Sequence, residues 1–132
     1  MKTLNVGLEQ NSYNILIDPG LLGKLGALIQ PFIQPVESVA VVTDEDVWRH
    51  HGAAFGAAMN GIGYRPIIVP AGEIAAGLGN IRTMNVVLLG TLVRTLGLGT
   101  LAGVEWEDVL TDLIPGKLLE VNLAAFKAGL NG

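Results

Sequence analysis

Alternating hydrophobic and polar residues open the chain and predict a β-hairpin. Along Lys2–Glu9 every second side chain is apolar, and the same alternation returns over Tyr13–Ile17. Residues two apart share one face of a strand, so each run fits a strand with one apolar face. Gln10 and Asn11 supply the turn between the two runs.

A strand–helix–strand pattern follows the hairpin. Ser38–Val42 and Arg65–Val69 are short, apolar and rich in β-branched residues, which predicts two buried strands. Thr43 or Asp44 can cap the helix that begins after the first strand. Strands joined by a helix of this length pair in parallel. With the hairpin, a sheet of four strands is expected.

The other expected elements are helices. Helical spacing of apolar residues predicts one that opens at Pro19 and is ended by Pro31 and Pro35. Beyond residue 70 the expected helices are about Asn80–Leu96, Glu105–Leu113, and Lys117–Ala128 with its end at Gly129. No linker or repeat divides the chain. The expected fold is therefore α/β: a single Rossmann-like domain over residues 1–132. It has a small, mostly parallel sheet with an N-terminal hairpin, helices packed on that sheet, and an all-helical C-terminal part.

Composition narrows the possible functions. Half of the 132 residues are hydrophobic, so the chain can bury a core. The net charge of −4 and the scattered basic residues argue against binding nucleic acid. The absence of cysteine excludes disulfides and thiol catalysis. No apolar run approaches the ~20 residues of a membrane span, and no signal peptide is visible, so a cytoplasmic protein is expected.

Residues 1–73 carry motifs of one enzyme family. The matching segments are Lys2–Val6, Ser12–Ile17, Pro19–Leu22, Val39–Glu45 and Val69–Glu73. In order and spacing they resemble the N-terminal segment of 3-dehydroquinate synthase. That resemblance implies part of an NAD site at Asp44, Gly72 and Glu73, with Asp44 near the adenosine ribose. Capping of the following helix is the other interpretation of Asp44, and the two are compatible.

Residues 73–132 carry motifs of another family. The matching segments are Glu73–Ala75, Leu78–Asn80, Asn85–Gly90 and Pro115–Leu123. They resemble the C-terminal segment of the gamma subunit of 2-oxoacid:ferredoxin oxidoreductases. The resemblance implies packing and subunit contacts there, not a cofactor site. The change of resemblance falls at Pro70–Glu73.

Neither resemblance brings a complete active site. The lysine that follows the synthase motif by three residues is replaced by Ala76, and the glycine-rich phosphate loop of that family is missing. His50 and His51 are adjacent, whereas metal ligands on a helix are three or four residues apart. Neither Ser12 nor Ser38 lies in a nucleophile elbow. No catalytic residue, no metal site and no cofactor is expected, with NAD as the alternative.

The leading hypothesis is an engineered or recombined chimera of the two families, without native catalytic activity, that tests whether their fragments fold together. One alternative is a nucleotide-binding module that keeps part of the synthase NAD site, and another is a non-catalytic assembly subunit. The helix Asn80–Leu96 is apolar around most of its circumference. A homodimer through this helix, or through the last helix around Phe126, is therefore expected.

Overall fold

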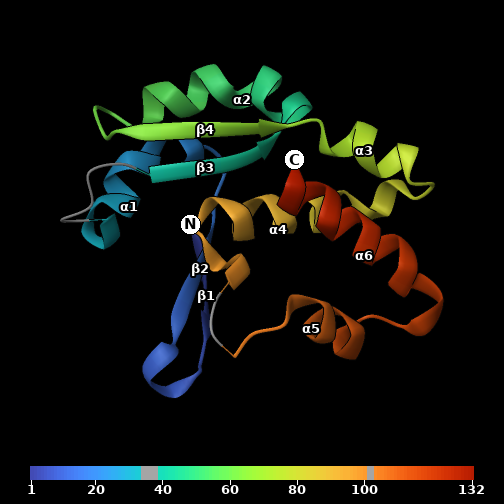
Figure 1. The fold of residues 1–132 in the computed structure, drawn as a ribbon. Helices are drawn as coiled ribbons and strands as arrows, with labels where there is room; N and C mark the ends of the chain where they lie inside the picture. Colours follow the sequence, from blue (N-terminus) through green and yellow to red (C-terminus); the bar gives the residue numbers. More distant parts are fainter. Residues whose placement is uncertain (34–38, 101–102) are drawn as a thin grey trace. The chain divides into compact units, whose positions relative to one another are not determined.

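Two compact units make up the chain in a computed structural model, which describes residues 1–33, 39–100 and 103–132 (Figure 1). The first unit comprises Met1–Val39 and His51–Gly63, and the second comprises Ala40–His50 and Tyr64–Gly132. The fold is mixed α/β with a mostly helical C-terminal half. Whether the chain is one domain stays a prediction.

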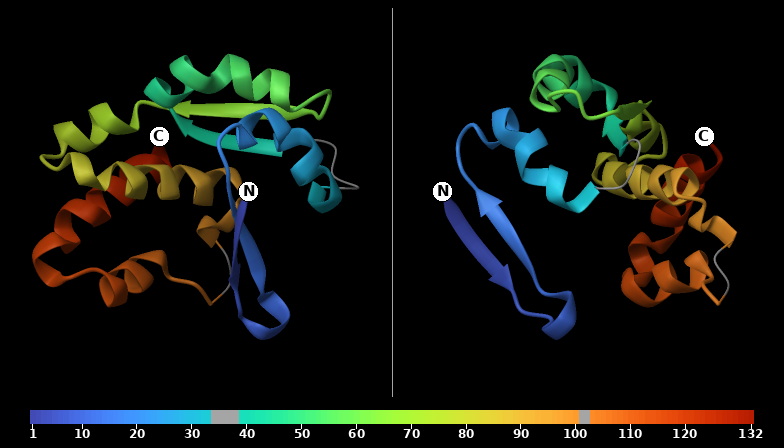
Figure 2. Two further views of the ribbon diagram at one scale, coloured as in Figure 1. Left: turned by 180° about the vertical axis from the view of Figure 1, so that it is seen from behind. Right: turned by 90° about the vertical axis from the view of Figure 1, so that its left-hand side faces the viewer.

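The predicted hairpin is confirmed in the first unit. Strands β1 (Lys2–Val6) and β2 (Tyr13–Ile17) pair antiparallel and run side by side in both views of Figure 2. The turn contains a short 3-10 helix, η1 (Glu9–Asn11). The hydroxyl of Ser12 accepts a hydrogen bond from the Leu8 amide (2.9 Å), which closes the turn locally.

The helix expected after the hairpin continues past Pro31. A 3-10 turn, η2 (Leu21–Lys24), leads into α1 (Leu25–Ile33), which contains Pro31. Pro31 alone therefore does not end the helix, although a proline in a helix removes one hydrogen bond and crowds the preceding turn. Ile33 is the last described residue before the gap at residues 34–38. Pro35 lies outside the described residues. Gly26 of α1 lies against backbone, since an added Cβ would be 2.6 Å from the carbonyl oxygen of Ala58.

The strand–helix–strand pattern is also confirmed. Strands β3 (Val39–Asp44) and β4 (Tyr64–Val69) form a two-stranded parallel sheet and are joined by α2 (Glu45–Ala58) (Figure 1). Ser38, the expected first residue of β3, lies outside the described residues. Among the described residues this sheet and the hairpin are separate, so the predicted four-stranded sheet is wrong. Alternation specifies the faces of a strand, but not which edge another strand would use.

Burial in the parallel sheet is concentrated at its carboxyl end. Ile68 is 45% exposed and Ala40 is also exposed, so the expected burial of both strands along their length is wrong. The final residues are different: Asp44 is 6% exposed and Val69 is 8% exposed. A sheet of two strands is narrow, so most of its residues stay accessible to solvent. The end of β4 is the part that packs into the core of the second unit.

The helical half contains one helix that the pattern missed and one that runs longer than expected. Its elements are α3 (Ala71–Gly77), η3 (Ile81–Thr83), α4 (Met84–Thr95), η4 (Leu98–Thr100), α5 (Trp106–Leu113) and α6 (Gly116–Asn131). The short α3 follows Pro70, in a segment for which no helix was predicted. The end of α6 expected at Gly129 is wrong, because this glycine packs against α4 in the helix interior.

Helices α4 and α6 cross at very short range, as Figures 1 and 2 show. A Cβ added to Gly129 would lie 1.9 Å from the carbonyl oxygen of Val87, and one added to Gly90 would lie 2.2 Å from that of Phe126. The Thr91 hydroxyl between them lies 3.2 Å from the Val87 carbonyl oxygen and 3.3 Å from that of Gly129. Only glycine at both positions permits this backbone contact.

The core of the second unit extends from this crossing. Two clusters of buried residues are Val69, Ala71, Val87 and Ala125, and Val93, Leu110 and Phe126. The first cluster joins the end of β4 and the start of α3 to the crossing, and the second joins α5 to it. The indole of Trp106 packs on Phe126 with ring centroids 5.9 Å apart, and its N–H donates to the Leu98 carbonyl oxygen at 2.9 Å.

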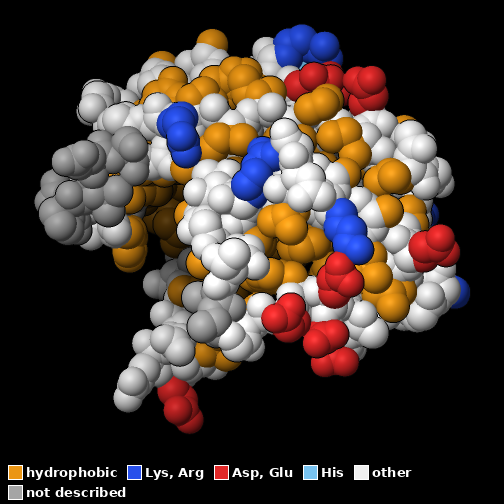
Figure 3. All heavy atoms as spheres, in the orientation of Figure 1, with side chains coloured by type: hydrophobic (Ala, Val, Ile, Leu, Met, Phe, Trp, Pro, Cys, Tyr) orange, Lys and Arg blue, Asp and Glu red, His pale blue; other side chains and the backbone are white. Residues whose placement is uncertain are grey.

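Figure 3 shows how the charged side chains are distributed over one face. On the face drawn in Figure 3, Lys and Arg side chains do not gather into a single patch, and hydrophobic side chains lie among them. Exposed apolar residues include Phe32 (85%) and Leu113 (76%). Within the part of the chain that the structure describes, no helix combines the length and apolarity needed to cross a bilayer.

Replacing Gly129 with alanine should destabilise the fold by more than about 2 kcal/mol. Overpacking a filled interface costs ~1–3 kcal/mol, and an added Cβ only 1.9 Å from backbone exceeds the usual case. More than about 2 kcal/mol therefore remains after the ~1 kcal/mol gain in helix propensity. Urea unfolding of Gly129→Ala measures the change. Gly116→Ala is the matched control in the same helix, since nothing lies within 4 Å of its added Cβ. Equal stability of the two variants would contradict the close crossing.

Candidate functional site

The predicted site residues lie where the two parallel strands end. Asp44 is the last residue of β3 and is followed directly by α2, and β4 ends at Val69, just before α3. Ligands of open α/β sheets bind outside the carboxyl ends of the strands. The edge that carries Asp44 is therefore where a nucleotide would be expected.

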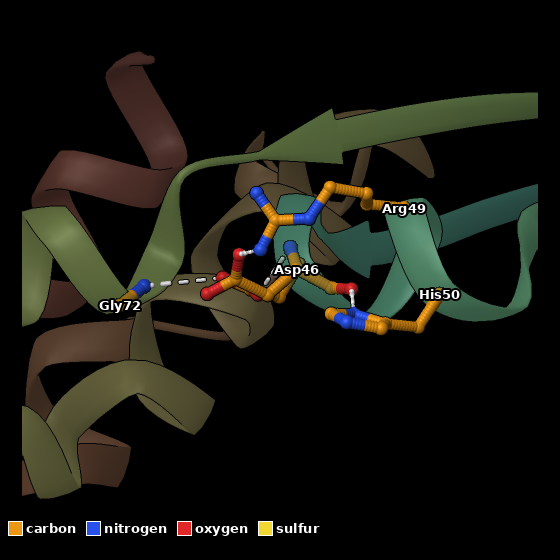
Figure 4. Close-up of polar contacts among 5 residues, drawn as sticks. Asp46, Arg49, His50 and Gly72 are labelled. Atoms are coloured by element: carbon orange, nitrogen blue, oxygen red, sulfur yellow. Dashed lines mark hydrogen bonds and ion pairs between the residues drawn. The ribbon is translucent and has the colours of Figure 1, made fainter.

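The carboxylate of Asp44 is held by the starts of two helices. The amide of Asp46 in α2 donates to Oδ1 at 2.9 Å, and the amide of Gly72 in α3 donates to Oδ2 at 3.1 Å (Figure 4). The first contact is a helix cap, so the capping interpretation of Asp44 is confirmed. The second contact spans the chain from the end of β3 to α3. One buried side chain thus links the starts of the two helices that follow β3 and β4.

This environment keeps Asp44 ionised. Burial alone would raise the pKa of the carboxyl group. The backbone N–H groups of Asp46, Gly72, Val47 and Ala71 outweigh that effect and hold the pKa below its ordinary value. Donors directed at the charged form stabilise it. Asp44 therefore carries its charge at neutral pH as an acceptor for backbone donors.

The first turn of α2 carries further polar contacts, drawn in Figure 4. The carboxylate of Asp46 forms an ion pair with the Arg49 guanidinium, three residues along the helix. The Nδ1 atom of His50 lies 2.7 Å from the Asp46 carbonyl oxygen. The sequence interpretation missed the Asp46–Arg49 pair, although opposite charges three residues apart on a helix are a usable signal. Both side chains are exposed, so the pair contributes little to stability.

The structure brings together two of the three predicted site residues. Gly72 is half-buried against Asp44, and Glu73 follows it as an exposed residue in the first turn of α3. A Cβ added to Gly72 would lie 3.9 Å from Asp44 Oδ2. Asp44 Oδ2 already accepts a hydrogen bond from the Gly72 amide. Nucleotide binding by these three residues stays a prediction.

Polar groups elsewhere in the chain are the other possible metal ligands. Within residues 1–33, 39–100 and 103–132, no three His, Asp or Glu side chains are grouped as metal ligands. Glu107, at the start of α5, forms an ion pair with Lys127 of α6 at 2.8 Å. In the first turn of α5 the negative charge of Glu107 also interacts favourably with the helix dipole.

These features define an α/β protein in which the carboxyl ends of a parallel strand pair are tied to the following helices. Comparison with known families is more specific. The sequence profile described as pyruvate ferredoxin/flavodoxin oxidoreductase matches residues 14–132. The chain therefore belongs to this family. No solved structure matches the chain significantly.

Curated relatives come from the other family. A 3-dehydroquinate synthase of Caulobacter vibrioides is 40% identical over 63 residues, which cover 48% of this chain and 17% of that protein. The synthase of Rhodospirillum rubrum is 36% identical over 116 residues, covering 84% of this chain and 28% of that protein. The synthase of Ruegeria pomeroyi is 39% identical over 79 residues, 58% of this chain and 21% of that protein. The chain thus spans only 17% to 28% of the length of these relatives.

Both predicted resemblances are confirmed, but they overlap. The oxidoreductase profile begins at residue 14, well before residue 73. A match over 84% of the chain must in turn extend beyond residue 73. The comparisons therefore place features of both families in the chain without a sharp boundary at Pro70–Glu73.

Asp44→Asn should lower the free energy of unfolding by about 1–3 kcal/mol at pH 7, because one backbone N–H would then face an amide donor. The folded-state pKa of Asp44 is depressed, so its contribution is present above the unfolded value of about 3.9 and is lost as pH falls through the folded value. The difference between the two proteins should therefore be constant above about pH 5 and shrink below about pH 4.

Urea unfolding between pH 3 and pH 7 measures this difference, given that about 1–3 kcal/mol is readily resolved. Asp112→Asn is the control, because Asp112 is an exposed residue of α5. A difference that is absent at neutral pH, or that grows on acidification, would contradict the role assigned to Asp44.

Proposed function

We propose that this chain has no catalytic activity of its own and is a structural α/β segment that combines features of two enzyme families. The observation that carries the proposal is the use of Asp44. Its carboxylate is buried, and each oxygen accepts a backbone N–H at the start of a helix. A group engaged in this way supports the fold, whereas a catalytic or ligand-binding carboxylate needs an oxygen directed at its substrate.

The extent of the similarities supports the same proposal. The relatives named 3-dehydroquinate synthase are matched over only 17% to 28% of their length. Catalytic sites draw on residues from several parts of a fold, so a match to so small a share of the synthases includes few of the residues of their site. A Rossmann-like domain and a cytoplasmic location belong to the proposal as well.

A recombined or engineered origin would explain why the chain is similar to two different enzyme families. The chain resembles synthases in its curated relatives and matches an oxidoreductase family over residues 14–132. In a recombined chain, fragments of two α/β families would share the Pro70–Glu73 motif. Finding one natural chain that contains both sets of motifs throughout would remove the need for recombination.

The purified protein should neither form 3-dehydroquinate nor oxidise pyruvate above a buffer control. Calorimetry should also detect no binding of NAD or ADP tighter than about 100 µM, or about −5.5 kcal/mol. Turnover of either substrate would refute the absence of catalysis. Nucleotide binding that is tighter than this limit and is weakened by Asp44→Ala would instead favour a residual nucleotide-binding module.

We also propose that the chain associates as a homodimer through α4. One face of this helix packs on α6. Three apolar residues remain exposed: Leu92 within the helix (40%), Ile81 just before it (57%) and Leu96 just after it (55%). Exposed apolar stripes of this kind favour self-association. The other expected surface, the C-terminal helix at Phe126, has less support, because Phe126 is 1% exposed and lies in the core of the second unit.

Sedimentation at micromolar concentration should give twice the monomer mass of 13.8 kDa. Leu92→Glu should shift the protein to the monomer, because a carboxylate buried at an interface lacks a partner. Leu113→Glu, at a 76% exposed position on α5, should leave the mass unchanged. A single species near 13.8 kDa for the unmodified chain would refute the dimer.

A further inference from the structure

Two asparagine–glycine pairs occur in the chain, Asn60–Gly61 and Asn131–Gly132. In such a pair the backbone nitrogen of the glycine can attack the carboxamide carbon of the asparagine, because glycine has no Cβ to hinder the approach. The two dipeptides are chemically identical but lie in different surroundings. A difference in reactivity between them therefore comes from the fold.

The first pair forms an exposed turn after α2, within the first unit. Asn60 has a φ of 49° and Gly61 a φ of 86°, and the Ile62 amide donates across them to the Met59 carbonyl oxygen at 3.0 Å. These φ angles match a type I′ turn, for which Asn-Gly is a preferred pair. Nothing lies within 4 Å of a Cβ added to Gly61. A ring that joins the two residues therefore has room to form.

The two glycine amides differ in their hydrogen bonds. Within residues 1–33, 39–100 and 103–132, the Gly61 amide donates to no acceptor, whereas the Gly132 amide donates to the Ala128 carbonyl oxygen at 3.0 Å. A Cβ added to Gly132 would lie 2.9 Å from that oxygen and 3.2 Å from Arg94 Nη1. A nitrogen in a hydrogen bond must give up that bond before it can attack. The fold thus leaves the nitrogen of Gly61 available and restrains that of Gly132.

We propose that Asn60 is a site of spontaneous deamidation. The nitrogen of Gly61 forms a bond to Cγ of Asn60, the bond from Cγ to Nδ2 breaks, and Nδ2 leaves as ammonia with the backbone proton. Water then opens the resulting succinimide at either carbonyl group, which gives aspartate or isoaspartate. Water is the only reagent consumed, and no electrons are transferred. The proposal goes beyond the absence of catalysis, because it concerns a reaction of the chain itself.

The isoaspartate product loosens the turn. It carries an additional methylene group in the main chain, between the two residues that the Ile62–Met59 hydrogen bond joins. Met59 is 1% exposed, and its carbonyl oxygen would lie 2.9 Å from a Cβ added to Gly26 of α1. Lengthening the turn therefore displaces backbone that packs on α1.

The test is incubation of the purified protein at neutral pH, followed over time by peptide mass spectrometry. Fragmentation locates each exchange of an amide for a carboxyl group, and chromatography separates aspartyl from isoaspartyl peptides. Asn60 should be modified about fivefold faster than Asn131, since a hydrogen bond of about 1 kcal/mol changes a population by that factor. The difference should shrink in the urea-unfolded chain, where neither backbone nitrogen is restrained.

Two results would overturn the proposal. One is modification of Asn131 in the folded protein at the same rate as Asn60, or at a higher rate. The other is an unmodified Asn60 in the folded protein over a period in which the unfolded chain reacts.

Variants separate the reaction from its consequence. Asn60→Gln should stay unmodified over the same period, because a longer side chain closes the ring more slowly, and Asn131→Gln should leave the rate at Asn60 unchanged. Asn60→Asp carries the charge of the product on a normal main chain, and aspartate tolerates a positive φ. It should keep the urea midpoint of the parent, whereas the isolated isoaspartyl form should unfold at lower urea. Equal midpoints for these two forms would overturn the loosening of the turn.

Discussion

The second unit depends on the backbone contact between α4 and α6 at Gly90 and Gly129. No side chain fits there, since an added Cβ at either position would lie within 2.2 Å of a carbonyl oxygen. The close approach places Val87 and Ala125 against the end of β4, so the crossing also positions the strand end and the start of α3. Burial of this cluster, in turn, stabilises two glycine-containing helices against their lower helix propensity.

The Asp44 carboxylate makes the corresponding connection at the sheet. It joins α2 to α3 through two backbone N–H groups, and the depressed pKa of its carboxyl group follows from those same donors. A residue that resemblance associates with nucleotide binding thereby has a structural role in this chain. Buried polar groups of any folded chain need hydrogen-bond partners, and the two backbone N–H groups supply them here.

Local patterns predicted the hairpin, the strand–helix–strand segment and the main helices, because alternation and helical spacing are local properties of the sequence. The pattern did not predict that Gly129 lies inside α6. A glycine is needed at this position because the backbone of α4, nearly forty residues earlier in the chain, lies against it. The cap at Asp44 was predicted from its place before a helix. Its second partner, Gly72, lies 28 residues away, so only the tertiary fold brings the two together.

The most direct measurement of the central claim is the titration of the Asp44 carboxyl carbon by NMR, with and without NAD. If Asp44 is a structural link, its pKa lies below the ordinary aspartate value of about 3.9 and does not change when NAD is added. An ordinary pKa, together with a shift of the carboxyl resonance on adding NAD, would show instead that the carboxylate is available to a nucleotide. That result would contradict the account.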